Sequence, residues 1–144
     1  MARTPSTYVD YRVSVAVVGT VLRYIGVVPL FPLVLALSYG EDPVPFVATS
    51  AVMIGGGYLL ERVRGDGDLG NREAFLLVSL AWLVVPMAGT VPYLVAGVGT
   101  VADPVNAMFE SMSGFTTTGA TVLGTISVER HGHAMLMWRQ LTQW

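Results

Sequence analysis

Residues 109–123 read FESMSGFTTTGATVL, and this stretch decides the fold. A short amphipathic segment runs into three threonines and a glycine at residues 116–119. The segment begins at Asp103 and Pro104, where the aspartate can cap a helix and the proline fits its first turn. About ten helical residues fit between positions 104 and 113, roughly 15 Å, which is half the thickness of a bilayer core. The pattern predicts a half-length helix that leads into a polar loop.

The loop has the composition of an ion filter. Backbone carbonyls of a loop at membrane depth can replace the water shell of a cation, and threonine hydroxyls can add further oxygens. Gly119 gives the backbone the freedom in φ to aim successive carbonyls at one axis. The carboxyl end of the half-length helix carries about half a negative charge, which favours a cation. A bare T-T-T-G is usually an ordinary polar turn, but this setting favours a re-entrant pore helix and a filter loop.

Composition places the chain in a membrane. Apolar residues make up 53% of the 144 residues and charged residues 12%, about half the charged share of a soluble domain. The net charge of −2 excludes the basic footprint of a nucleic-acid-binding protein. The absence of cysteine excludes disulfides, thiolate metal sites and cysteine nucleophiles.

The sequence holds no convincing catalytic constellation. His131 and His133 are two residues apart, so on a helix they point to different faces, and we expect no zinc site there. Neither a Ser/His/Asp set nor paired carboxylates are in evidence. We therefore expect neither an enzyme nor a cofactor.

Three apolar runs, residues 13–37, 44–60 and 74–98, are each long enough to cross a hydrocarbon core of about 30 Å. We expect Pro29 and Pro32 to kink the first run. The fold class is therefore all-α membrane: transmembrane helices plus a re-entrant pore helix and filter loop, in a helix–pore loop–helix unit that is incomplete.

Arginine placement predicts the orientation of the spans. Arg3 and Arg12 precede the first span, and the loop at residues 61–72, between the second and third, holds three more arginines. The turn between the first two spans has two acids and no base. The positive-inside rule then places the N-terminus in the cytoplasm and the filter loop toward the outside of a multi-pass protein of the cell membrane.

Three motifs in order resemble the Trk/Ktr/HKT potassium transporter superfamily, and most closely its TrkH-like membrane subunits. Residues 113–121, SGFTTTGAT, match the family's filter pattern S-G-[FL]-T-T-T-G-A-[ST]. Residues 137–144, MWRQLTQW, are similar to the start of the helix after the filter, and residues 71–78 look like the polar start of the helix before the pore loop. The resemblance implies potassium transport, with the potassium ion as substrate.

The resemblance also implies the site residues. The filter would consist of Thr116, Thr117, Thr118, Gly119 and Ala120, with potassium held at Thr117, Thr118 and Gly119. Three further residues would support the filter: Glu110, Ser113 and Arg139.

The charged residues of the apolar stretches allow several interpretations, because a charge at membrane depth is costly. We expect Glu110 to support the pore loop by pairing with Arg139 or by hydrogen bonds, rather than to bind the ion; the alternative is an acid at the outer rim that faces water. Arg139 could instead face the pore and repel cations, or snorkel. Arg23 is interpreted as structural or snorkelling.

In the family, the helix–pore loop–helix unit recurs four times around the ion, whereas this sequence contains one. We divide it into residues 1–72, a cytoplasmic N-terminus with two leading helices, and residues 73–144, a first repeat truncated in its last helix. That helix has about a dozen of the roughly 20 residues needed to span. The chain is thus interpreted as an N-terminal fragment.

The partners expected are membrane lipid, the remaining repeats of the same transporter or identical subunits, and a cytosolic nucleotide-binding regulatory subunit of the kind the family often uses. Two alternatives stay open: a short homotetrameric potassium channel and a non-conducting membrane assembly subunit.

Overall fold

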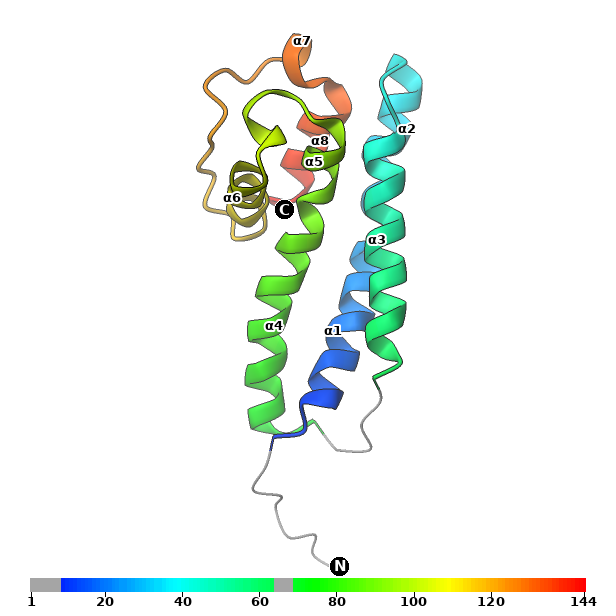
Figure 1. The fold of residues 1–144 in the computed structure, drawn as a ribbon, viewed down its shortest axis with the longest axis vertical. Coiled ribbons are helices and arrows are strands. Elements are labelled where there is room, and N and C mark those ends of the chain that lie inside the picture. Colours follow the sequence, from blue (N-terminus) through cyan, green and yellow to red (C-terminus); the bar gives the residue numbers. More distant parts are fainter. Residues whose placement is uncertain (1–8, 64–68) are drawn as a thin grey trace, which may run out of the picture.

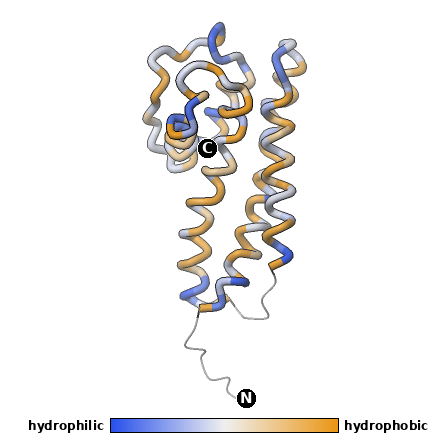
Figure 2. Tube along the Cα trace, in the orientation of Figure 1, coloured by the Kyte–Doolittle hydropathy of each residue, from blue (hydrophilic) through white to orange (hydrophobic). Residues whose placement is uncertain are grey.

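The computed structural model describes residues 9–63 and 69–144, and over these ranges it forms helices and no strand. Three helical spans are long and apolar enough to cross a membrane: Tyr11–Tyr39, Val44–Glu61 and Asn71–Ala96. They lie along one long axis, with the shorter helices gathered at one end (Figure 1). Hydrophilic segments mark both ends of these spans and apolar residues dominate between them (Figure 2). Arg3 and Arg64, used in the orientation argument, lie outside the described residues.

The first span consists of α1 (Tyr11–Ile25) and α2 (Leu30–Tyr39), with the predicted interruption between them. Pro29 and Pro32 lack the N–H groups that would bond four residues back. The carbonyl of Ile25 instead accepts from Val28 N at 2.9 Å, and the carbonyl of Val28 accepts from Phe31 N at 3.1 Å. These shorter-range bonds satisfy the carbonyls that the prolines leave free.

The second span, α3 (Val44–Glu61), crosses α1 at two glycines. A Cβ on Gly19 would lie 2.6 Å from the carbonyl oxygen of Gly57, and a Cβ on Gly57 would lie 2.5 Å from that of Gly19. The two backbones therefore touch where neither residue has a side chain. Arg23 pairs with Glu61 at 3.2 Å beside this crossing, which agrees with the structural one of the two roles considered for it.

The third span is broken, unlike the single run expected at residues 74–98. It consists of α4 (Asn71–Gly89) and α5 (Val91–Ala96). Thr90 donates both its N–H and its hydroxyl to the carbonyl of Met87, at 3.2 and 2.6 Å. This tight turn ends α4, and Pro92 lies in the first turn of α5.

The remaining helices gather at the end where α4 leads into α5. They are η1 (Gly99–Ala102), α6 (Pro104–Phe115), α7 (Val128–His131) and α8 (His133–Leu141). Figure 1 shows α6 nearly end-on, so it runs across the direction of α4. The helix predicted at residues 104–113 ends two residues later than expected, and α7 was not predicted.

Candidate functional site

α6 is capped at its start and packs against the end of α4, where the third span is broken. The side chain of Asp103 accepts hydrogen bonds from Val105 N at 3.0 Å and Asn106 N at 3.2 Å, as the Asp-Pro pattern predicts. The hydroxyl of Ser111 donates to the carbonyl of Pro86 in α4 at 2.6 Å. A Cβ on Gly89 would lie 2.6 Å from that hydroxyl, so glycine is needed for this approach.

The chain turns sharply after α6. Thr118 N and Gly119 N both donate to the carbonyl of Ser113, at 3.0 and 3.4 Å. Gly119 has a φ of 73°, in the left-handed region that glycine adopts without strain. Thr117 has a φ of 55° and is the sole non-glycine residue with positive φ in the described part of the chain. The sequence contained no signal for this conformation of Thr117.

Four successive carbonyls of the turn have no hydrogen-bond donor. No hydrogen bond among the described residues ends on a carbonyl oxygen of residues 116–119, and all four residues are exposed. The sign of φ alternates along them: −84° at Thr116, positive at Thr117, and positive again at Gly119. In extended backbone successive carbonyls point to opposite sides, and a backbone in which the sign of φ alternates departs from that pattern.

Ala120 differs from the four residues before it. Its carbonyl accepts a hydrogen bond of 2.6 Å from the hydroxyl of Ser113 in the last turn of α6. Ser113 thus binds three successive residues in the second half of the turn, since its own carbonyl accepts from Thr118 and Gly119.

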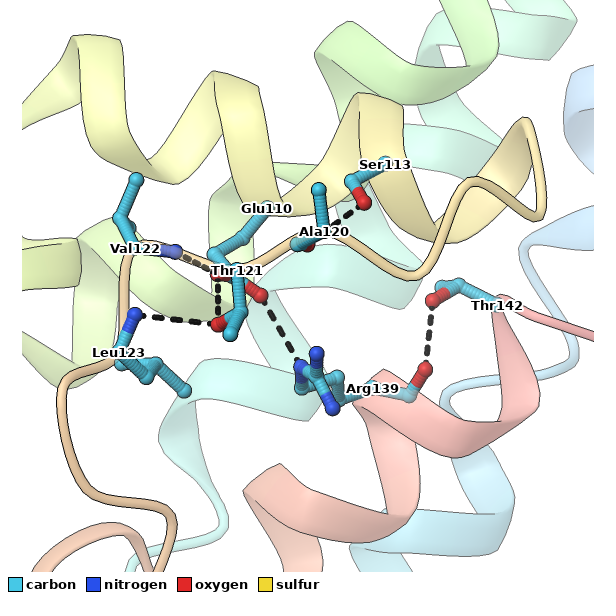
Figure 3. Close-up of polar contacts among 8 residues, drawn as sticks. All are labelled: Glu110, Ser113, Ala120, Thr121, Val122, Leu123, Arg139 and Thr142. Atoms are coloured by element: carbon cyan, nitrogen blue, oxygen red, sulfur yellow. Dashed lines mark hydrogen bonds and ion pairs between the residues drawn. The ribbon is translucent and has the colours of Figure 1, made fainter.

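Glu110 binds the segment that follows the turn, at Thr121 and Val122 (Figure 3). Its side chain is 1% exposed. One carboxylate oxygen accepts hydrogen bonds from the hydroxyl of Thr121 and from Val122 N, the latter at 2.7 Å. The other oxygen accepts from Arg139 Nε at 3.0 Å. A buried charge is tolerable only when paired and hydrogen-bonded in this way.

Arg139 belongs to α8, which packs against the end of α6. Its side chain is 10% exposed, and its carbonyl accepts from the hydroxyl of Thr142 at 2.9 Å. A Cβ on Gly114 would clash with that same threonine hydroxyl. Of the alternatives open from sequence, the ion pair between Glu110 and Arg139 is present. Burial argues against a carboxylate that faces water and against a snorkelling arginine.

A second polar cluster joins the turn after α2 to the start of α8. Glu41 Oε1 accepts from His133 N at 2.7 Å and lies 2.9 Å from His133 Nδ1, and Glu41 Oε2 accepts from Ala134 N at 2.9 Å. The ring of Tyr39 stacks on that of His133, with centroids 3.9 Å apart. Sequence reasoning placed Glu41 only in a turn, because its partners are more than 90 positions away.

No protein-family model matches the chain. The Trk system potassium uptake protein TrkH of Vibrio parahaemolyticus is 36% identical to it over 138 residues, which cover 94% of this chain and 28% of that protein. TrkH of Escherichia coli K12 is 33% identical over 139 residues, covering 93% and 28%.

The crystal structure of the potassium transporter TrkH from Vibrio parahaemolyticus is similar over 94% of this chain and 29% of its own, with a TM-score of 0.80 and 35% identity. The chain spans a little over a quarter of the length of these relatives. The likeness confirms the all-helical fold of a multi-pass membrane protein that composition and periodicity predict.

Proposed function

Because this chain is homologous to the TrkH potassium uptake proteins over most of its length, we propose that it supplies one selectivity-filter loop for potassium transport across the cell membrane. The observation that carries the proposal is the run of four unpaired, exposed carbonyls at residues 116–119. Unpaired backbone carbonyls are rare in folded proteins unless water or a ligand reaches them. A potassium ion is the ligand that such a run fits, because carbonyl oxygens replace its hydration shell.

The proposed ion ligands are the carbonyls of Thr117, Thr118 and Gly119, with Thr116 and Ala120 at the margins. The positive φ of Thr117 and Gly119 supports this choice, since alternation in the sign of φ allows neighbouring carbonyls to point to the same side. The hydroxyl of Thr116 bonds to Met112 O at 2.7 Å and to the Thr118 hydroxyl at 2.8 Å. These side chains thus stiffen the turn, which leaves the backbone oxygens for the ion.

In this proposal Glu110, Ser113 and Arg139 support the filter and do not bind the ion. Ser113 holds Ala120, and Glu110 holds Val122, so the chain is fixed just after the free carbonyls, and α6 fixes it just before them. Fixed oxygens matter because selectivity depends on the number and placement of the oxygens around the ion. Arg139 neutralises the carboxylate and so prevents it from attracting cations without selection.

One loop cannot surround an ion, so the other oxygens must come from elsewhere. We propose that residues 73–144 form one helix–pore loop–helix repeat, preceded by two leading helices, and that the remaining repeats of the same transporter, or identical subunits, complete the ring. Membrane lipid would cover the outer faces of the spans. A cytosolic nucleotide-binding regulatory subunit is a further proposed partner, on the resemblance alone.

The test is Gly119→Ser in the complete transporter. Nothing lies within 4 Å of a Cβ built on Gly119, so serine would act by straining the backbone at φ +73° and not by a clash. Gly97→Ser is the matched control, since Gly97 has a φ of +61° and equally open surroundings. We expect Gly119→Ser to weaken discrimination of potassium over sodium in uptake assays and Gly97→Ser to leave it intact. Equal discrimination in both variants would contradict the proposal.

We also propose that the N-terminus is cytoplasmic. The starts of α1 and α4 and the end of α3, which carry Arg12, Arg72 and Arg62, lie at one end of the spans (Figure 1). The turn between α2 and α3, which carries Glu41 and Asp42, lies at the other end. In a cysteine-free transporter, an impermeant thiol reagent added to intact cells should label Thr125→Cys and miss Leu69→Cys. Labelling at position 69 alone would contradict the proposal and would place the N-terminus outside.

A further inference from the structure

The first turn of α8 is fastened to the turn after α2 by a single carboxylate. Glu41 accepts three hydrogen bonds there: two from backbone N–H groups, His133 and Ala134, and one at the ring of His133. A carboxylate at a helix N-terminus also interacts favourably with the helix dipole. Gly132, which precedes α8, has a φ of 77°, and a Cβ on it would lie 2.9 Å from Glu41 Oε2. The local backbone is thus shaped around this carboxylate.

α8 then connects that anchor to the support of the loop. Arg139 follows His133 by six residues, about 9 Å along a helix. Its Nε lies 3.0 Å from Glu110 Oε2, and a hydrogen bond of this kind weakens when the distance exceeds about 3.2 Å. A shift of α8 by a few tenths of an ångström would therefore loosen the ion pair. Glu110 in turn holds Val122 N at 2.7 Å.

We propose that Glu41 is a positioning residue for the loop: by anchoring the start of α8, it sets the point from which Arg139 holds Glu110. The effect on the loop's geometry follows from these contacts, and the effect on ion selectivity rests on the proposed function above. The turn after α2, which carries Glu41, lies at the same end of the molecule as α7 and as the loop between α6 and α7 (Figure 1). Glu41 touches none of the proposed filter residues and acts through α8.

The first test measures hydrogen–deuterium exchange of the complete transporter in the peptide that contains Val122 and Leu123. The variant is Glu41→Gln, which keeps the shape of the side chain but turns an amide donor toward a backbone N–H. We expect exchange in this peptide to rise about two- to thirtyfold, the range found for substitutions that couple at a distance. Asp42→Asn is the matched control, because among residues 9–63 and 69–144 the carboxylate of Asp42 accepts only from Val44 N within its own turn. Its peptide pattern near residue 122 should be unchanged.

A double-mutant cycle distinguishes positioning from a general loss of stability. Glu110→Gln breaks the connection between Arg139 and the loop. If Glu41 acts through that connection, adding Glu41→Gln to Glu110→Gln should raise exchange near Val122 no further. If the two substitutions raise exchange near Val122 additively in the double variant, the proposal is overturned.

A milder variant covers the case in which Glu41→Gln does not accumulate. His133→Phe keeps the stack on Tyr39 and both backbone bonds, and removes one of the three bonds to Glu41. It should raise exchange in the same peptide by a smaller factor. No increase in either variant that folds would overturn the inference.

The uptake readout separates this inference from the proposed function. If Glu41→Gln raises exchange and weakens potassium discrimination, both the positioning role of Glu41 and the filter assignment are supported. Raised exchange with discrimination unchanged in Glu41→Gln and in Gly119→Ser would sink the filter assignment and leave the positioning role. Unchanged exchange together with a selectivity loss in Gly119→Ser would sink the positioning role alone.

Discussion

Where α1 crosses α3, two glycines bring the backbones into contact, and where α8 meets α6, a buried and hydrogen-bonded ion pair joins them. The helix crossing depends on the close packing of two backbones. The contact of α8 with α6 depends on the direction of particular donors and acceptors around Glu110. Dispersion contacts at a helix crossing are many and individually weak, whereas the loop depends on one carboxylate with three donors.

The difference implies two kinds of sensitivity. A change in the spans should alter how much transporter folds, because it alters packing everywhere along the crossing. A change in the Glu110 network should also alter how the loop is shaped, because each bond fixes one point of the backbone. Three substitutions and one change of pH distinguish the two kinds of sensitivity.

The largest effect is expected from Arg139→Met, which leaves the carboxylate of Glu110 buried without its partner. Breaking a buried pair by removing one member costs about 3–5 kcal/mol. Arg23→Met is the matched control: the Arg23–Glu61 side chains are 39% and 21% exposed, against 10% and 1% for Arg139 and Glu110. A pair as exposed as this one contributes about 0–1 kcal/mol. The measurement is the fraction of folded transporter after heating, by size-exclusion chromatography; equal losses would remove the distinction between the two pairs.

Gly57→Ala should come next. Its Cβ would press on the carbonyl of Gly19 at 2.5 Å, and overpacking of this kind costs about 1–3 kcal/mol. Gly55→Ala, where nothing lies within 4 Å, should leave the yield of folded protein unchanged. Neither should alter potassium discrimination per folded molecule, and a selectivity change in Gly57→Ala would mean that the spans shape the loop directly.

Thr121→Val removes one hydroxyl from the network while keeping the volume of the side chain. Glu110 would lose a donor and Leu123 N an acceptor, at a cost of about 1 kcal/mol. We expect near-normal yield but faster exchange at Val122 and weaker potassium discrimination. Thr121→Ser keeps the hydroxyl and should behave like the unmodified protein; equal behaviour of the two variants would show that this bond is unimportant.

The smallest effect concerns pH at Glu41. Burial raises the pKa of this carboxyl, but the bonds from Ala134 and His133 outweigh it and hold the pKa below the ordinary 4.5. A carboxyl with a lowered pKa stabilises the fold above its unfolded value and loses this contribution as the pH falls through its folded value. In the His133→Phe background, Glu41→Gln should therefore lower the denaturation temperature equally between about pH 8 and pH 5. The difference in denaturation temperature between the two proteins should shrink below pH 4.5. A difference that shrinks already at neutral pH would contradict a lowered pKa for Glu41.

Local patterns predicted the elements well where a residue acts on its own backbone. Pro29 and Pro32 lack N–H groups wherever they occur, so the interruption of the first span was predictable. Asp103 caps the helix that begins at Pro104 for the same reason. The break at Thr90 was not predicted, because a threonine continues or ends a helix according to its surroundings. The left-handed Thr117 is similar: its conformation depends on the bonds that Ser113 and Gly114 make with the turn.

Composition and periodicity by themselves indicated that the protein lies in a lipid bilayer. They also gave the number of its spans and the position of the half-length helix. In a bilayer every backbone polar group must be satisfied inside its own helix, so a long apolar run has essentially one outcome. The tertiary structure alone decided which distant groups meet. Several acids could have paired with Arg139, and only the packing of α8 on α6 selects Glu110. The contact of Glu41 with His133 likewise joins residues that lie more than 90 positions apart, where no local pattern reaches.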